Sequence, residues 1–413
     1  MNKIFQNKKI IEQMRSGPLC PYIDHYAEQL VADGYTKRSA DRMLRLIVLF
    51  SRWMEGKRIL ASKLAPKHIT DYLRYREGIE YRPYLGDAPA LTRMLKLLKK
   101  HDVIAEGVSQ RTLTPSEMLL KEYDTHLEKD RCLALATRIS YLSFSRKFVT
   151  KALGKHLAKL SKLHAADVIK FVQRRAANMK PRCAQLMTTA LRSFLHFVYY
   201  RGNLARDLTA CVPSVASWSL STVPRSIPAA HVKQVLFACN RKNAVGRRDY
   251  AILLLLARLG LRSGEVARLK LEDIEWKSGC ITIHGKAGRT DQLPVPPDVG
   301  KAIAAYLRDG RPKISGNRFL FLRTRAPLAG FKDQQSVGAV VKRALLRAGI
   351  VSPRNGAHQF RHALASEMLR QGCSLSEIGE ILRHERQNTT AIYAKVDLTS
   401  LRMLAQPWPG GEQ

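Results

Sequence analysis

The chain has 413 residues, with 70 Lys and Arg against 34 Asp and Glu, which gives a formal net charge of +36. At roughly 100–200 residues per domain, this length corresponds to two or three domains. A hydrophobic fraction of 45% excludes a collagen-like, coiled-coil or mostly disordered chain. The charge predicts a polyanionic partner, with nucleic acid as the first candidate, and favours it over a merely solvated basic surface.

The cysteines and the apolar segments indicate the cellular compartment in which the protein works. Seven cysteines lie far apart without a CxxC pair, so we expect neither a disulfide framework nor a zinc module. The N-terminus has no apolar run long enough for a signal peptide. The most apolar stretch, residues 251–257, is far shorter than the ~20 residues that span a bilayer. We therefore expect a soluble cytoplasmic protein.

The first half of the chain predicts helices, because apolar residues recur at three- and four-residue spacing. They are expected at residues 24–32, 37–54, 65–76, 91–100, 115–128, 135–153, 165–176 and 182–200. The last four resemble the first four: Tyr26 precedes Tyr123 by 97 residues, and Tyr72 precedes Phe171 by 99. We take this as a hypothesis of two helical modules in tandem, both basic and both able to lie on DNA.

The pattern changes after residue 202. Three prolines and the serines between them make residues 203–228 a predicted linker. Beyond it, strands are expected at residues 273–276, 280–284 and 292–295, and helices at 229–240, 247–259, 263–269, 297–307, 334–348, 358–370, 375–384 and 389–395. Ser374 and Glu377 form a predicted capping box for the helix that follows. The fold class is therefore mainly α with a small antiparallel β-sheet (α+β).

Six residues in this second half form a candidate active site. They are Arg262, Lys286, His358, Arg361, His384 and Tyr393. Together they suit the attack of a tyrosine oxygen on a phosphodiester, which conserves the bond energy in a covalent intermediate. Two guanidiniums can hold the charge that gathers on the phosphate, while a lysine and a histidine can move protons.

Each of these residues also has a structural explanation. Arg262 is placed to form a surface ion pair with Glu265, which would contribute only ~0–1 kcal/mol. His384 suits a helix end through the macrodipole, and Tyr393 suits a half-buried core. The joint occurrence of all six in this order favours the catalytic interpretation over these separate ones.

The order of the six residues resembles the tyrosine recombinases, or lambda-integrase family, over residues 229–406. GLRSGE, HQFRH and LRHERQNTTAIYAKV resemble the family's boxes, and ITIHGKAGRTDQLPV resembles its β-hairpin. The resemblance implies that Tyr393 is the nucleophile and that Arg262 and Arg361 bind the scissile phosphate. It also implies that Lys286 protonates the leaving 5′ oxygen, that His358 is a general acid/base, and that His384 binds phosphate.

The resemblance implies a domain plan as well. Residues 1–110 would form an N-terminal helical module, residues 111–202 the helical core-DNA-binding domain (SAM-like), and residues 229–413, after the linker at 203–228, the catalytic domain. Glu265 matches a position that braces the first arginine. Three positions depart from the pattern: Arg383 where many members have Gly, Lys395 where many have His, and Asp291 where many have Arg.

We therefore expect a site-specific DNA recombinase, an integrase associated with a mobile element, which needs no metal, ATP or other cofactor. Its expected partners are double-stranded DNA and further copies of itself, assembled as a homotetramer on two sites. Two alternatives stay open from the residues alone: a type IB topoisomerase-like enzyme, and a non-catalytic DNA-binding protein derived from a recombinase.

Overall fold

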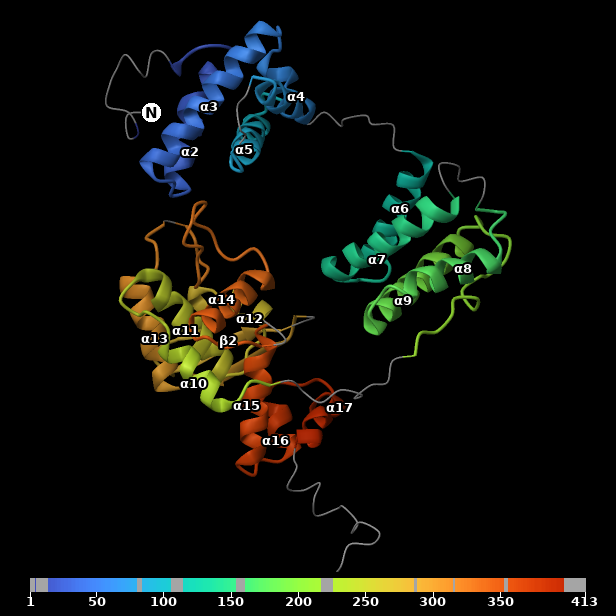
Figure 1. Ribbon diagram of the computed structural model, residues 1–413, viewed down its shortest axis with the longest axis vertical. Coiled ribbons are helices and arrows are strands. Elements are labelled where there is room, and N and C mark those ends of the chain that lie inside the picture. The colour runs from blue at the N-terminus through green and yellow to red at the C-terminus, as the bar shows by residue number, and fades with distance from the viewer. Residues whose placement is uncertain are drawn as a thin grey trace, which may run out of the picture. The chain divides into compact units, whose positions relative to one another are not determined.

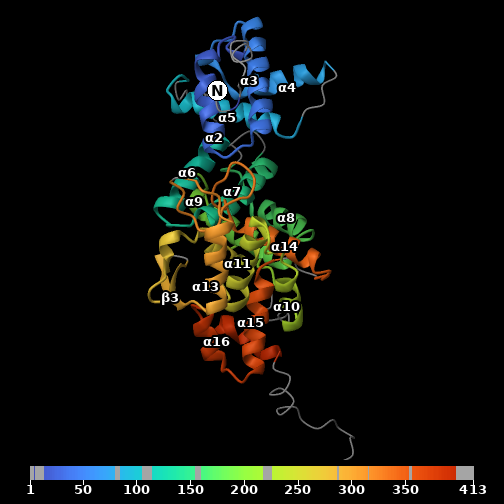
Figure 2. The same ribbon diagram turned by 90° about the vertical axis from the view of Figure 1, so that its left-hand side faces the viewer.

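The structure is a computed structural model that describes residue 4 and residues 14–79, 84–104, 114–153, 160–216, 226–285, 288–314, 316–352 and 356–396. The chain folds as two compact units, one of Met1–Glu106 with Thr222–Gln413 and the other of Gly107–Ser221. Both are mainly helical, and the described residues contain one three-stranded antiparallel sheet (Figures 1 and 2). The predicted fold class is confirmed. None of the described helices has the length and apolar character needed to cross a membrane.

The first helical module follows the predicted pattern. It contains α2 (Ile23–Ala32), α3 (Lys37–Gly56), α4 (Pro66–Glu77) and α5 (Asp87–Lys100), which share one hydrophobic core. Helix α5 begins four residues before its predicted start. The Asp87 carboxylate accepts a hydrogen bond from the Tyr84 backbone N–H at 3.2 Å, and this local contact organises the extra turn.

The second helical module has a core of its own. It contains α6 (Pro115–Lys129), α7 (Leu135–Phe148), α8 (Ala165–Ala176) and α9 (Pro181–Tyr200). A capping box between Thr114 and Glu117 begins α6. Helix α7 ends at Phe148 and continues only as a π turn, Val149–Leu153, where the periodicity predicts one helix through residue 153.

The two modules repeat the same internal contacts. The buried Tyr26 hydroxyl donates to the Ala90 carbonyl at 3.0 Å, and the buried Tyr123 hydroxyl lies 3.5 Å from the Ala190 carbonyl and 2.9 Å from Ser193 Oγ. Buried positions in α5 and α9 also correspond at a separation of 100 residues: Leu91, Met94, Leu95, Leu97 and Leu98 match Leu191, Phe194, Leu195, Phe197 and Val198. These matches support the tandem-module hypothesis, which stays a prediction.

The part of the chain after residue 225 is built around one apolar helix, α11 (Ala244–Arg258). Residues 251–256 of this helix, in the most apolar stretch of the sequence, are all buried, so this stretch forms part of the hydrophobic core. Five further helices contribute to the same core: α10 (Ala229–Phe237), α12 (Ser263–Arg268), α13 (Pro297–Asp309), α14 (Gln334–Arg347) and α15 (His358–Arg370).

The sheet follows α12 directly. Its strands β1 (Ile274–Glu275), β2 (Cys280–His284) and β3 (Thr290–Pro294) pair in sequence order, with Ile281 opposite Leu293 and His284 opposite Thr290. The pair nearest the turn, His284 with Thr290, brings residues 285 and 289 together. The Gly285 N–H donates to the Arg289 carbonyl at 2.7 Å. The hairpin was predicted, with β3 starting two residues later than observed.

The C-terminal elements differ most from expectation. Helix α15 (His358–Arg370) lies where it was predicted, and the Ser374–Glu377 capping box begins α16 (Leu375–Ile381) as predicted. Helix α16 ends three residues early, because Arg383 adopts a left-handed backbone with φ 55° and the His384 N–H turns back to the Gly379 carbonyl at 2.9 Å. The predicted helix at 389–395 is wrong: α17 (Gln387–Thr390) is one turn, followed by a 3-10 turn at Ala391–Val396.

Candidate active site

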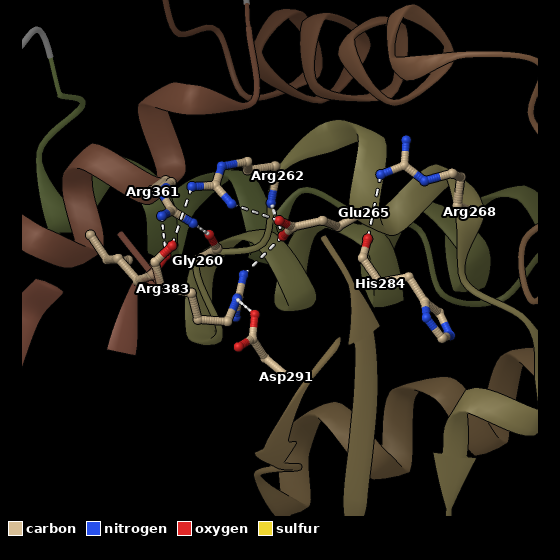
Figure 3. A network of polar contacts seen from close by, with 9 residues as sticks. Gly260, Arg262, Glu265, Arg268, His284, Asp291, Arg361 and Arg383 are labelled. Carbon is tan, nitrogen blue, oxygen red and sulfur yellow. Dashed lines mark hydrogen bonds and ion pairs between the residues drawn. The ribbon is translucent and has the colours of Figure 1, made fainter. Parts of the chain in front are cut away.

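Arg262 stands at the junction between α11 and α12, where its guanidinium is held but not covered. Its backbone N–H and its Nη1 donate to the two oxygens of Glu265, at 2.8 and 2.9 Å. The Glu265 side chain is 3% exposed, whereas the Arg262 side chain is 41% exposed. The buried carboxylate therefore fixes the arginine (Figure 3), while much of the Arg262 side chain stays open to solvent.

Arg361 is the buried counterpart of Arg262. It lies in the first turn of α15, where Nη1 donates to the Gly260 carbonyl at 2.6 Å and Nη2 donates to the Leu382 carbonyl (Figure 3). Burial, and then the charges of Arg262 and Arg383, lower the pKa of Arg361 to about 10, so the group is a cation at neutral pH. One side chain thus connects the end of α11, the start of α15 and the end of α16.

A third guanidinium, that of Arg383, adjoins the first two. Its Nη2 donates to Glu265 Oε2 at 2.8 Å, and its Nε lies 3.8 Å from Asp291 Oδ2 on β3. The Arg383 carbonyl in turn accepts from Arg262 Nη2 at 3.4 Å. Sequence reasoning placed Arg383 among the departures from the family pattern and not among the site residues. The departures at 291 and 383 are neighbours in the fold (Figure 3).

Tyr393 lies in the 3-10 turn and is 1% exposed. Its hydroxyl is 2.9 Å from His362 Nδ1, and its ring is parallel to that of His384, with centroids 6.5 Å apart and 7° between the planes. Burial raises the pKa of the Tyr393 phenol to about 12, with the Arg361 charge acting in the opposite direction. The phenol is therefore neutral at physiological pH.

His362 is a site residue that sequence reasoning missed. It follows His358 by four residues on α15, so both side chains lie on one face of the helix, and their ring centroids are 6.5 Å apart. The HQFRH motif already contained this i, i+4 pair of histidines. That spacing was the available signal for a second histidine beside the tyrosine.

The two histidines of the predicted set both have pKa values below the ordinary value for histidine. His358 keeps an exposed face, yet partial burial, Arg361 and Arg262 lower its pKa. Burial, followed by Arg361, Arg262 and other nearby cations, lowers the pKa of His384 to about 4. The His384 Nδ1 forms a 2.7 Å hydrogen bond with Thr390 Oγ1. His384 is therefore neutral at physiological pH.

Of the six predicted residues, five lie in this connected region. They are Arg262, His358, Arg361, His384 and Tyr393. Lys286 lies outside the described residues, although the two strands that flank its turn are described. Among the described residues, no group of three or more His, Cys, Asp or Glu side chains could hold a metal ion.

A site of this kind suits chemistry on an anionic ester. Three guanidiniums provide fixed positive charge, which is worth most where water is partly excluded. A neutral phenol beside an imidazole provides a nucleophile with a proton acceptor in hydrogen-bond reach. The geometry thus combines an anion site with a nucleophile.

Comparison with known proteins identifies the family. Residues 225–399 match the phage integrase family. The chain is 46% identical to the putative integrase/recombinase y4rA of Sinorhizobium fredii (strain NBRC 101917 / NGR234) over 96% of both chains. It is 28% identical to the tyrosine recombinase XerA of Pyrococcus furiosus (strain ATCC 43587 / DSM 3638 / JCM 8422 / Vc1), over 71% of this chain and 94% of XerA.

Two solved structures share the fold. The XerH site-specific recombinase bound to palindromic difH substrate aligns with a TM-score of 0.57 and 18% identity, over 83% of this chain and 95% of that chain. A lambda integrase(75–356) dimer bound to a COC′ core site aligns with a TM-score of 0.52 and 16% identity, over 71% and 98%. With the similarity to y4rA along nearly the whole sequence, these findings establish that the chain belongs to the phage integrase family of tyrosine recombinases.

Proposed function

We propose that the chain is a site-specific DNA recombinase that cuts and rejoins strands through a 3′-phosphotyrosine formed on Tyr393. The observation that carries this proposal is the position of the Tyr393 phenol, which lies beside His362 and His384 and within the electrostatic influence of Arg361. Family membership supports the same activity.

The arginines have a direct role in this chemistry. In-line attack puts negative charge on the non-bridging oxygens of the phosphate, and guanidiniums can donate to them bidentately. Arg262 has the exposed face required to reach a DNA phosphate, whereas Arg361 is fixed by two carbonyls. A preorganised donor of this kind is worth on the order of 3–4 kcal/mol in the transition state.

The proton balance of the step follows from the geometry. The Tyr393 oxygen forms a bond to phosphorus, the bond from phosphorus to the 5′ oxygen breaks, and the phenol proton must leave. His362 Nδ1, at 2.9 Å from the hydroxyl, is positioned to accept it. The 5′ oxygen takes up a proton, for which Lys286 is the donor that the family resemblance implies, and the reverse sequence on a partner strand completes the exchange.

The same proposal assigns His384 and His358 different tasks. His384 is neutral at physiological pH because its pKa is about 4, so it serves as a hydrogen-bond donor to phosphate and not as an additional cation. His358 keeps an exposed face at the start of α15 and is the general acid/base that the resemblance implies. Both roles need a DNA phosphate at the arginines.

The expected partners and domain roles belong to this proposal as well. Double-stranded DNA is the substrate, and a homotetramer on two sites is the working assembly. Residues 229–413 would be catalytic, residues 111–202 would be the core-binding domain, and residues 1–110 would be an additional module. A cytoplasmic location and a mobile-element role stay predictions.

A nicked suicide substrate tests the activity. The purified full chain is incubated with nicked duplex fragments taken from the DNA that flanks its own gene, and covalent adducts are recovered under denaturing conditions and mapped by peptide sequencing. We expect an adduct on Tyr393 that Tyr393→Phe does not form. Equal adduct from both proteins would exclude Tyr393 as the nucleophile, and wild-type protein that binds these fragments without forming an adduct would favour a binding function.

A further inference from the structure

The strongest unassigned feature is the ion cluster formed by Arg383, Glu265 and Asp291. We propose that Arg383 is a positioning residue that keeps the Arg262 guanidinium available to the scissile phosphate, by binding the oxygen of the Glu265 carboxylate that the Arg262 guanidinium does not bind. This inference rests on the proposed function for the identity of the anion. The control of Arg262 by Arg383 rests on the contacts alone.

The backbone at residue 383 shows that this arginine is not there for local conformational reasons. Its φ of 55° lies in the left-handed region, which glycine adopts freely and residues with a Cβ adopt reluctantly. The turn directs the residue's carbonyl to Arg262 Nη2 and its side chain to Glu265. Glycine would form this turn with less strain. We therefore attribute the arginine at this position to the contacts of its guanidinium.

The position of the guanidinium excludes direct contact with DNA in this arrangement. The Arg383 side chain is 7% exposed, and its Nε and Nη1 are buried without a hydrogen-bond partner among the described residues. A buried charge of this kind is costly unless it is paired. Its pairs are Glu265 at 2.8 Å and Asp291 at 3.8 Å, so Arg383 acts through these carboxylates.

The division of Glu265 between two arginines determines the charge at the phosphate site. Oε1 accepts from Arg262 Nη1, whereas Oε2 accepts from Arg383 Nη2 and from the Arg262 backbone. Without Arg383, two arginines (Arg262 and Arg361) and two carboxylates (Glu265 and Asp291) would remain, with no excess positive charge, and Arg262 would carry the pairing of the 3% exposed Glu265 carboxylate. With Arg383 present, the three arginines and two carboxylates leave an excess positive charge beside the exposed face of Arg262.

A substitution at Asp291 can separate the effect of the Arg383 charge from the effect of the strained backbone at residue 383. Its side chain is 37% exposed on β3, and its Oδ2 lies 3.8 Å from Arg383 Nε. An arginine at position 291 can therefore extend into the space that the Arg383 guanidinium leaves empty. Arg383→Gly removes the cation and relieves the backbone, and adding Asp291→Arg returns a cation from the neighbouring strand.

The experiment measures the availability of Arg262 and the reaction rate separately. Full-length wild type, Arg383→Gly and Arg383→Gly/Asp291→Arg are treated with phenylglyoxal, and modification of Arg262 is followed by peptide mass spectrometry. We expect Arg262 modification to fall several-fold in Arg383→Gly and to return in the double variant. The matched control is Arg268→Ala, which removes another arginine near the site. Arg268 lies in α12, the helix that contains Glu265, and its side chain contacts the His284 carbonyl. This variant is expected to leave Arg262 modification unchanged.

Adduct kinetics on the nicked substrate provide the second readout. We expect Arg383→Gly to lower the rate at saturating DNA at least 10-fold and the double variant to recover most of it. Unchanged or increased Arg262 modification in Arg383→Gly, or an adduct rate equal to wild type, would overturn the inference. If wild type forms no Tyr393 adduct while Arg262 modification follows the expected order, the proposed function fails and the control of Arg262 by Arg383 stands.

Discussion

Two arginines in the site have opposite surroundings, and their surroundings determine how each contributes. Arg361 donates to two backbone carbonyls from distant segments and is 4% exposed. Arg262 is 41% exposed and is held by one buried carboxylate. Arg361 therefore contributes to folding and to the charge of the site, whereas Arg262 mainly contributes charge.

Replacing each arginine by lysine separates these contributions. Arg361→Lys loses the fork of donors that reaches both carbonyls, so we expect the free energy of unfolding to fall by about 1–3 kcal/mol and adduct formation to fall ~100-fold or more. Arg262→Lys, the matched control, is expected to lose a similar factor in rate with little change in stability. Urea denaturation and adduct kinetics check both, and equal stability losses in the two variants would contradict the distinction.

The depressed pKa of His384 predicts how stability depends on pH. The pKa is about 4 in the folded chain against an ordinary value of 6.5, so between these values the unfolded chain binds more protons than the folded chain. Neutral His384 therefore costs the folded chain no stability above pH 6.5. As the pH falls from 6.5 toward 4, protonation of the unfolded chain lowers the free energy of unfolding. Urea denaturation at stepped pH should show a shallower acid loss in His384→Asn, and identical acid profiles would refute the assignment.

At the scale of elements, the site depends on one tight junction between α11 and α12. Gly260 has φ 57° there, and its carbonyl accepts the Arg361 hydrogen bond. A Cβ at this position would lie 2.7 Å from Leu382 Cδ2. The junction is thus closed by direct contact with the end of α16, which also carries Arg383.

Gly260→Ala tests this junction against a matched glycine. Gly279 has φ 66° in the turn before β2 with open space around it, so Gly279→Ala introduces only the conformational cost of about 1–2 kcal/mol. Gly260→Ala adds about 1–3 kcal/mol for overpacking against Leu382, and we expect it to reduce adduct formation as well. Equal unfolding free energies for the two variants would show that the Leu382 side chain moves away from the new Cβ at no cost in stability.

The elements that sequence could predict are those defined by local rules. Apolar periodicity and the Ser374–Glu377 capping box placed the helices, and the turn residues placed the hairpin. The partners of Arg361 could not be predicted, because Gly260 lies 101 residues away in the chain. The helix expected around Tyr393 was wrong, since tertiary contacts with His362 and His384 hold that segment as short turns.

At the scale of the whole molecule, positive charge is spread along the chain and not confined to the catalytic part. Residues 1–106 contain 20 Lys and Arg against 12 Asp and Glu. Three lysines of α5, Lys96, Lys99 and Lys100, are exposed, and the buried faces of α5 and α9 match at a constant separation. From the positive charge and the exposed lysines we predict that the first module, like the second, binds DNA.

Salt titration of DNA binding tests the role of the first module. Each phosphate contact contributes a slope of about −0.9 to the dependence of log K on log salt concentration. Changing Lys96, Lys99 and Lys100 together to glutamine should weaken binding and reduce this slope, whereas changing all three to arginine should retain it. Fluorescence anisotropy on duplex DNA provides the measurement. An unchanged salt dependence of log K in the glutamine variant would show that the face of α5 with these three lysines does not contact DNA.

The covered position of Tyr393 has a consequence for the protein when no DNA is bound. A phenol that is 1% exposed and hydrogen-bonded to an imidazole has too little accessible surface to meet a DNA phosphate in this conformation. The proposed attack on DNA therefore requires the 3-10 turn at Ala391–Val396 to move before the Tyr393 oxygen can reach phosphorus.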